Sequence, residues 1–384
     1  MNVGNRESGI GNAHGGSVEP NTLAGLPAPA AEMRMTALHA TRGANYWSRL
    51  PVTRMDLVIG AYDEISSAHV PGVTGALLAA LPGLVEHRCS IGERGGFIAR
   101  LRRGTYAPHI IEHVALELQG QIGHDVGYGR TRGGDVPSEY TVVFEHVSDV
   151  VGLRAAALSF DIVQRAFAGT LETVEHAIAE LRALADQPSS APITQHVCCG
   201  ITGGALRAET RAELARRGVG GDDTLVVDVA PGYILQAGLP YAHSDLAIVL
   251  DDRPTDVPER YRDPERAARL VSVVADAVPE GGIVIAPATA WDVQDRARDA
   301  GCRVAVFAAD ASITAKDKKV ARAAAWVDDQ RILIEHADVL VDAGRVHGDA
   351  PVEAQVAAAL AAFTLEEMGP HTSDDGAVME NAAH

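Results

Sequence analysis

The stretch Pro108-His109-Ile110-Ile111-Glu112-His113-Val114-Ala115-Leu116-Glu117-Leu118 predicts a helix around which the first half of the chain is arranged. Its apolar residues recur at intervals of three and four, and a proline suits the first turn because its missing N–H is not needed there. On such a helix His109, Glu112 and His113 lie at positions i, i+3 and i+4, so their side chains project from one side. The spacing therefore allows two imidazoles and a carboxylate to reach a single ion.

The pattern His-x-x-Glu-His is the inverted zinc-peptidase motif, in which two imidazoles bind the metal and the glutamate takes a proton from metal-bound water. We therefore expect His109 and His113 to be zinc ligands and Glu112 to be the catalytic base. The third ligand is Glu117, one turn further on, with Glu145 and Glu86 as alternatives. Because so short a motif also arises by chance, the alternative is a surface helix whose histidines face solvent.

Composition and charge limit the class of protein. The chain has 384 residues, enough for two domains, and its 47% apolar content with only 4% aromatics suits helices packed on sheets. A net charge of −18 argues against nucleic acid or an anionic membrane as a partner.

Cysteine usage and hydropathy indicate the compartment. Cys89, Cys198, Cys199 and Cys302 show no paired spacing typical of a zinc ribbon or a disulfide framework. The sequence has neither a secretory signal at its start nor an apolar run of roughly 18 residues. We therefore expect a cytoplasmic protein.

Composition shifts predict the domain organisation. Residues 1–35 are rich in Gly, Asn, Ser, Pro and Ala without a period, which is typical of a disordered tail. A helix and a linker that ends in Asp186-Gln-Pro-Ser-Ser-Ala-Pro192 occupy residues 169–191. The expected organisation is thus a tail at 1–35, domains at 36–168 and 192–347 around that linker, and a helix with a polar tail at 348–384.

The second domain has the pattern of an α/β fold. Short apolar runs alternate with helical segments, and such alternation predicts a parallel sheet covered by helices. The strands are expected at residues 196–199, 224–229, 246–250, 283–285 and 304–307.

Several further motifs resemble one family. They are Arg42-Gly-Ala-Asn-Tyr-Trp-Ser48, Leu81-Pro-Gly-Leu-Val-Glu-His-Arg-Cys-Ser90, Arg94-Gly-Gly-Phe97, the 109–118 helix and Val126-Gly-Tyr-Gly-Arg-Thr-Arg132. In this order they resemble the N-terminal domain of cyanophycin synthetase, which builds a poly-aspartate backbone carrying arginine side groups. The resemblance implies an α+β domain that binds the polymer and, as in some members, holds a metallopeptidase-like site on the His-x-x-Glu-His helix.

The resemblance also suggests substrate-binding residues. Arg94, Arg130 and Arg132 are expected in Gly-flanked loops of the matching motifs, where a guanidinium can bind a carboxylate through two hydrogen bonds. His87 precedes the Gly-rich turn and joins them as a candidate. The expected ligand is a small peptide or an amino-acid conjugate.

The second domain resembles the central ATP-binding domain of Mur ligases through Val229-Ala-Pro-Gly-Tyr-Ile-Leu-Gln-Ala-Gly-Leu239 and the strand that follows. Its first loop departs from that family, because Gly204 and Ala205 stand where a phosphate loop needs lysine and threonine. The chain also shows no stretch for an ATP-grasp domain between its halves and no room for a third Mur domain. We therefore expect no ATP, and a homodimer or higher homo-oligomer in which residues 192–347 contribute the interface.

Together these observations predict a zinc-dependent amide hydrolase that acts on a peptide or isopeptide related to aspartate-containing conjugates. One alternative is a non-catalytic binding or scaffold protein derived from a cyanophycin synthetase-like ligase. A second alternative is an ATP-dependent amide ligase.

Overall fold

The computed structural model describes residues 25–89, 92–187, 193, 195–221 and 224–368. The described residues divide into two compact units: the first contains those up to 38 and within 54–144 and 153–186, and the second contains those within 39–53, 145–152 and 187–368. Most of the expected N-terminal tail, part of the linker and residues 369–384 lie outside the described residues. The second unit is therefore assembled from three separate stretches of chain.

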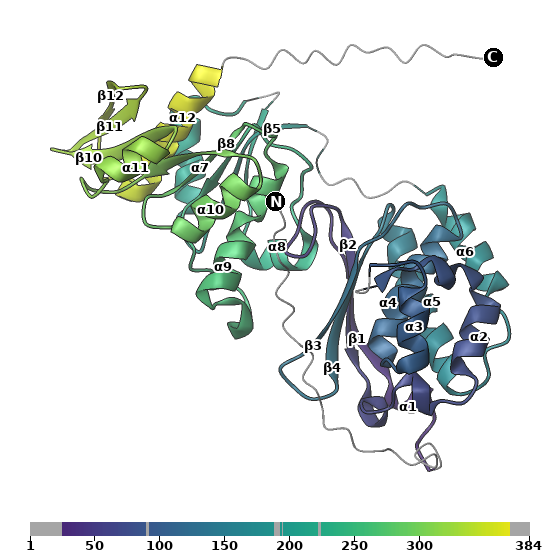
Figure 1. The fold of residues 1–384 in the computed structure, drawn as a ribbon. Helices are drawn as coiled ribbons and strands as arrows, with labels where there is room; N and C mark the ends of the chain where they lie inside the picture. The colour runs from purple at the N-terminus through teal and green to yellow at the C-terminus, as the bar shows by residue number, and fades with distance from the viewer. Residues whose placement is uncertain (1–24, 90–91, 188–192, 194, 222–223, 369–384) are drawn as a thin grey trace, which may run out of the picture. The chain divides into compact units, whose positions relative to one another are not determined.

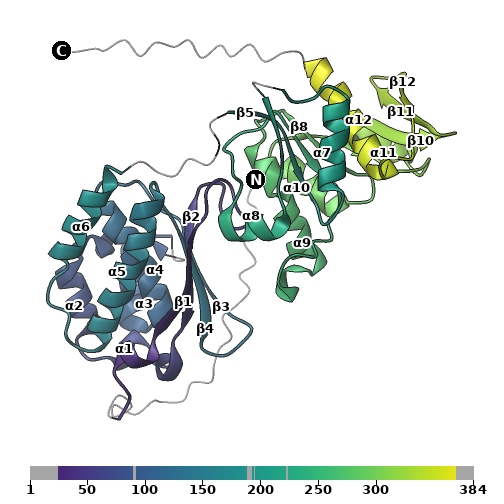
Figure 2. The ribbon, with the colours of Figure 1, turned by 180° about the vertical axis from the view of Figure 1, so that it is seen from behind.

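The first unit is a four-stranded sheet covered on one face by helices, as Figures 1 and 2 show. The strand order is β1-β2-β4-β3, and β3 runs antiparallel to β4. The strands are β1 (Arg34–Ala40), β2 (Val52–Val58), β3 (Gly129–Gly133) and β4 (Glu139–Glu145). The helices are α1 (Pro29–Glu32), α2 (Val73–Ala80), α3 (Gly96–Arg103), α4 (Ala107–Gly120), α5 (Asp149–Phe167) and α6 (Glu175–Ala185).

Helix α4 is the predicted histidine helix, and it is more deeply buried than its pattern indicates. It packs against β3, α6 and the 3-10 turn η3 (Pro82–Glu86), so neighbours lie on several sides of it. Its polar residues Glu112, His113 and Glu117 are each only 6% exposed. Because burial of a polar group without a partner is costly, these side chains need hydrogen bonds inside the protein.

The second unit contains an eight-stranded sheet with the order β12-β11-β10-β9-β8-β7-β5-β6. Neighbouring strands from β6 to β10 pair in parallel, which confirms the predicted α/β class. The strands are β5 (His196–Thr202), β6 (Thr224–Asp228), β7 (Leu246–Val249), β8 (Ile283–Pro287), β9 (Arg303–Phe307), β10 (Ala323–Asp328), β11 (Arg331–His336) and β12 (Val339–Arg345).

The antiparallel extension β10-β11-β12 was not expected from the sequence. Its two turns place Asp329, Gln330, Ala337 and Asp338 at positive φ, between 43° and 63°. Two-residue hairpin turns favour glycine at such positions. Neither of these turns contains the Asn-Gly or Asp-Gly pair that would have indicated a hairpin in the sequence. An alanine-rich β10 adds little strand propensity of its own.

Six helices complete the described part of the second unit. They are α7 (Arg207–Arg216), α8 (Pro231–Ala237), α9 (Pro264–Val271), α10 (Trp291–Asp299), α11 (Ala315–Val320) and α12 (Val352–Met368). Helix α12 packs against α7 and against strands β7 to β10, and its alanines allow close approach. None of the described helices is both long and apolar enough to cross a membrane.

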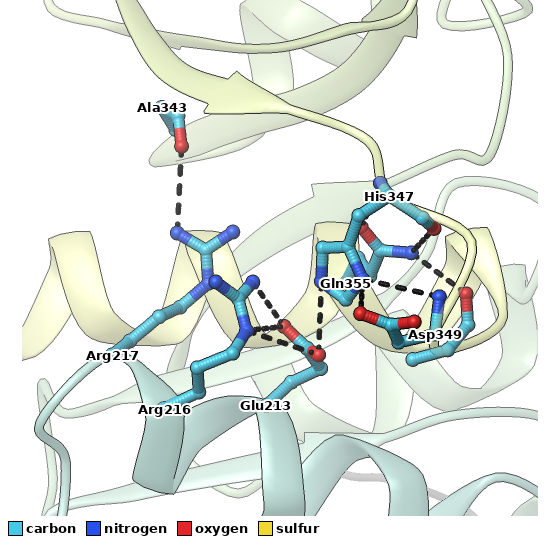
Figure 3. A network of polar contacts seen from close by, with 8 residues as sticks. Glu213, Arg216, Arg217, Ala343, His347, Asp349 and Gln355 are labelled. Carbon is cyan, nitrogen blue, oxygen red and sulfur yellow. Dashed lines mark hydrogen bonds and ion pairs between the residues drawn. The ribbon is translucent and has the colours of Figure 1, made fainter.

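A polar network joins α7 to the chain segment before α12, as Figure 3 shows. The buried carboxylate of Glu213 accepts hydrogen bonds from Arg216 and lies 3.1 Å from Nε2 of His347. The Gln355 side chain accepts from the backbone N–H of His347 at 3.0 Å and donates to its carbonyl oxygen at 2.8 Å. The network therefore fixes α12 to α7 by polar contacts as well as by apolar packing.

The 42–48 motif belongs to the second unit by its contacts. The N–H of Gly43 donates to the carbonyl of Leu239 at 2.8 Å, and a side chain at Gly43 would lie 2.7 Å from that same oxygen. Tyr46 packs edge-on against Tyr261 at 5.2 Å, and the guanidinium of Arg269 lies 4.7 Å from the Tyr46 ring centre. This motif is therefore a packing element of the second unit.

Candidate metal centre

Three ligand-type side chains converge in the first unit. Cys89, His109 and His113 each offer a donor atom, and these atoms lie within 4.8 Å of one another. Sγ of Cys89 is 3.4 Å from Nε2 of His109, and the hydroxyl of Thr105 is 2.8 Å from Nδ1 of the same ring. The ring of Phe97 stacks on His113 with 4.0 Å between centres. Helix α4 and the chain after η3 thus bring together one thiol and two imidazoles.

Burial keeps both imidazoles neutral. Loss of hydration lowers the pKa of His109 to about 4, and the nearby Arg100 lowers it further. Burial lowers the pKa of His113 to about 2, and His109, His87 and Arg100 add to this effect. Neutral imidazole is the form that binds metal ions, so the site needs no deprotonation of histidine near neutral pH.

Glu112 turns toward β3. Its carboxylate accepts a hydrogen bond from the hydroxyl of Thr131 at 2.5 Å, and Gly129 lies so close that a side chain there would come within 2.7 Å of the Glu112 Cγ. Burial raises the pKa of Glu112 to about 7, although Thr131, Arg100 and Arg130 oppose this. The structure therefore places the expected catalytic base against a strand, and it is not in the convergent group formed by the described residues.

Glu117 contacts a histidine instead of joining the convergent group. Its carboxylate accepts from Nε2 of His87 at 3.0 Å and from the Gln121 amide at 2.6 Å. Nδ1 of His87 in turn lies 2.9 Å from Nδ1 of His113. Glu117, the expected third ligand, is thus two contacts away from His113, because burial beside His87 gives its carboxylate another partner.

The two alternative third ligands also have other partners. Glu86 forms a surface ion pair with Arg94, and Glu145 accepts a hydrogen bond from the hydroxyl of Ser48 at 3.2 Å. Cys89 takes the third place in the convergent group. The sequence did not indicate this cysteine as a ligand, because a single thiol twenty positions before His109 has no ligand spacing.

The candidate substrate-binding arginines lie in different surroundings. Arg94 is exposed and paired with Glu86, so that pair must separate before Arg94 binds a ligand. Arg130 and Arg132 lie on β3, which is an edge strand and not the loop that the glycines indicate. Arg130 is close enough to Glu112 to lower the pKa of that carboxyl group.

The loop after β5 is occupied by a side chain of the protein itself. The N–H of Gly204 donates to both carboxylate oxygens of Asp251, at 2.9 and 3.0 Å, and the N–H of Ala205 donates at 3.1 Å. The N–H of Arg253 donates to the same carboxylate at 2.8 Å. Backbone N–H groups in such loops are the donors that bind phosphate in nucleotide sites. In this loop the N–H groups donate to the carboxylate of Asp251 instead.

Comparisons with known proteins show that the candidate metal-binding residues lie in a recognised domain. Residues 54–168 match the family described as the cyanophycin synthase-like N-terminal domain. A cyanophycin synthetase from Synechocystis sp. is 42% identical over 153 residues, 39% of this chain and 17% of that protein. One from Trichormus variabilis is 32% identical over 261 residues, 66% of this chain and 27% of that protein. The chain thus spans less than a third of either relative, and it is cyanophycin synthetase-like in this region.

Solved structures give a weaker likeness. A MurF ligase from Thermotoga maritima in complex with ADP is 13% identical with a TM-score of 0.34, and the match covers 52% of this chain and 51% of that one. A pseudomurein peptide ligase from Methanothermus fervidus is 12% identical with a TM-score of 0.33, over 53% of this chain and 52% of that one. Scores this low decide nothing about function.

The prediction of a zinc-dependent amide hydrolase, or metallopeptidase, is wrong. The relatives of the region that carries the motif are synthetases by name, so the family is one of enzymes, although not of hydrolases. The His-x-x-Glu-His spacing shows only which side chains share part of a helix. It does not determine the reaction, and Glu112 is bound to Thr131.

Proposed function

We propose that this chain, cyanophycin synthetase-like over residues 54–168, binds the peptide that is extended in ATP-dependent amide-bond formation, while another polypeptide supplies the ATP site. The observation that carries the proposal is the match of residues 54–168, which hold Cys89, His109 and His113, to the cyanophycin synthase-like N-terminal domain. The ligand class is a short peptide or conjugate of aspartate with a basic partner. The proposal includes a cytoplasmic location and neither nucleic acid nor a membrane as a partner.

The convergent group fits a divalent transition metal, with Zn²⁺ as the first candidate. One thiol and two imidazoles are the donor types that such ions take from proteins, and the donor atoms are already within 4.8 Å of each other. Three protein donors leave one position of a four-coordinate ion open, and a ligand carboxylate suits that position. The ion would supply a positive charge for binding the peptide.

Arginine side chains support the same ligand class. Arg130 and Arg132 alternate with Thr131 along β3, so they project from the face of the strand opposite to the Glu112 contact. Two guanidinium groups on one edge strand suit an acidic peptide, because each can bind a carboxylate through paired hydrogen bonds. The strand edge also offers backbone groups to an extended peptide.

The contacts of Asp251 support an ATP site elsewhere. A triphosphate could use the N–H groups of Gly204 and Ala205 only after displacing this carboxylate, and the loop has no lysine to compensate. The competing candidate is an autonomous ATP-dependent ligase, which the names of the relatives favour.

Calorimetric titration of a short aspartate–arginine peptide into zinc-loaded protein tests the proposal. Binding should weaken at least tenfold in Cys89→Ser and in Arg130→Ala, but not in the control Arg103→Ala, which changes an exposed arginine of α3. Equal binding by all variants would contradict the proposed peptide site. Phosphate release from ATP by the chain alone, together with amide formation, would favour the autonomous ligase.

A further inference from the structure

We infer that Glu117 and His87 position His113 as a metal ligand by determining which nitrogen of its ring carries the hydrogen. The inference rests on the metal centre of the proposed function. Neither Glu117 nor His87 belongs to the convergent group, yet both lie in a continuous chain of contacts that ends at His113. They are therefore positioning residues.

The Glu117 carboxylate fixes the order of donors and acceptors along this series of contacts. A carboxylate only accepts, so the 3.0 Å contact requires Nε2 of His87 to carry the hydrogen and donate to Glu117. In the neutral ring Nδ1 of His87 is then an acceptor. The 2.9 Å contact between the two Nδ1 atoms holds one hydrogen, which must belong to His113.

The consequence is that Nε2 of His113 keeps its lone pair for a metal ion. In His109 the hydroxyl of Thr105 lies beside Nδ1 and the thiol of Cys89 lies beside Nε2, so Nε2 is the nitrogen next to the candidate thiol ligand. A metal-binding histidine usually has its second nitrogen bound in this way, which fixes its tautomer and ring orientation.

Packing holds the Glu117 carboxylate and the His113 ring in place. The Glu117 side chain is buried, its second oxygen accepts from Gln121 at 2.6 Å, and its carboxylate occupies the space that a side chain at position 83 would fill. Phe97 stacks on His113 and restricts rotation of that ring. The contacts from Glu117 through His87 to His113 therefore have a defined geometry before any metal binds.

The informative variant is Glu117→Gln, which keeps the side-chain volume. With its oxygen taken by Gln121, the new amide presents N–H to Nε2 of His87 and reverses the order of donors, so Nε2 of His113 becomes protonated. Gln121→Ala is the matched control, because it removes the second bond of Glu117 and leaves the contact with His87. Circular dichroism checks that both variants remain folded.

Two measurements decide the inference. In the metal-free wild type, ¹⁵N-edited NMR should show His113 with hydrogen on Nδ1, and in Glu117→Gln with hydrogen on Nε2; an unchanged tautomer overturns the inference. Competition with a chromophoric chelator should show Zn²⁺ bound about 10- to 100-fold more weakly in Glu117→Gln than in wild type or Gln121→Ala. Equal affinities also overturn it, while the metal centre would stand. A wild type that binds no Zn²⁺ would instead refute the metal centre, and with it this role of Glu117.

Discussion

The backbone N–H of Gly204 donates to the carboxylate of Asp251, so the loop after the first parallel strand of the second unit already holds an anion. The N–H groups of Ala205 and Arg253 donate to the same carboxylate. A negative charge that is part of the chain competes with any phosphate at a high local concentration. The absence of a lysine from this loop and the presence of this internal carboxylate therefore both weaken the binding of a nucleotide phosphate.

Asp251→Ala should open this loop to external anions. We expect wild-type protein to show no rise in melting temperature with Mg-ATP. The variant should lose about 1–3 kcal/mol of stability, because three backbone donors lose their partner, and should regain part of it in sulfate or phosphate. Thermal unfolding with and without these anions measures both effects, and Asp252→Ala is the neighbouring control. An ATP-dependent stabilisation of the wild type would contradict this interpretation.

Gly83→Ala should disturb the surroundings of the metal centre. A side chain at Gly83 would collide with the carboxylate of Glu117, so that group or the η3 turn must move, and we expect a loss of about 1–3 kcal/mol. Gly75→Ala is the matched control, since nothing lies within 4 Å of a side chain there and alanine favours the helix. Urea unfolding compares the two. A Gly83→Ala protein as stable as the control would show that the carboxylate relaxes freely.

His146 should make stability depend on pH. Burial lowers the pKa of His146 from 6.5 to about 4, although Asp149 opposes this, and Nδ1 of His146 lies 3.0 Å from the hydroxyl of Thr53. Between pH 6.5 and 4 the unfolded state binds more protons than the folded state. The contribution of His146 to the free energy of unfolding should therefore be complete above pH 6.5. As the pH approaches 4, the free energy of unfolding should fall by up to about 3 kcal/mol.

His146→Asn tests this assignment, because it keeps a polar group near Thr53 but removes the titration. The decrease in unfolding free energy between pH 6.5 and 4 should become smaller in this variant. His39→Asn, at an exposed position of β1, is the control and should leave the decrease unchanged. Identical pH profiles for wild type and His146→Asn would assign the effect to other groups.

Glu213→Ala should loosen the attachment of α12. The buried carboxylate accepts from Arg216 on α7 and lies 3.1 Å from Nε2 of His347, and its removal leaves that buried nitrogen without its charged neighbour, at a cost of about 1–3 kcal/mol (Figure 3). Arg216→Ala removes only the more exposed partner and should cost less than about 1 kcal/mol. Hydrogen exchange of the α12 amides shows whether the loss is local. Equal protection of α12 in both variants would exclude a role for the network.

The second unit should also mediate self-association. Val339 and Leu340 of β12 are 59% and 57% exposed on the outermost strand of the sheet, where unpaired backbone groups favour strand addition. We expect a homodimer by light scattering at micromolar concentration. Lysine at both positions should shift the protein toward monomer, whereas a wild type that is already monomeric would reject the interface.

The parallel part of the second unit could be predicted because its strands are short apolar runs separated by helices, as at β5 and β7. The histidine helix could be predicted from its periodicity. The partners of Glu112 and Glu117 could not, because they depend on glycines 83 and 129, which periodicity does not connect to the helix. The sequence did not indicate Cys89 as a candidate ligand, because its position beside His109 is a product of tertiary folding.

The contacts of the 42–48 motif set a limit on the order of events during synthesis. Tyr46 and Trp47 are made early, but Tyr261 and Arg269, which cover Tyr46, are made only after most of the chain. Domains generally fold as units as they emerge from the ribosome. A nascent chain must therefore carry the Tyr46 side chain without these two partners until residue 269 has been made, and a chain that terminates earlier would present this aromatic side chain to chaperones and proteases.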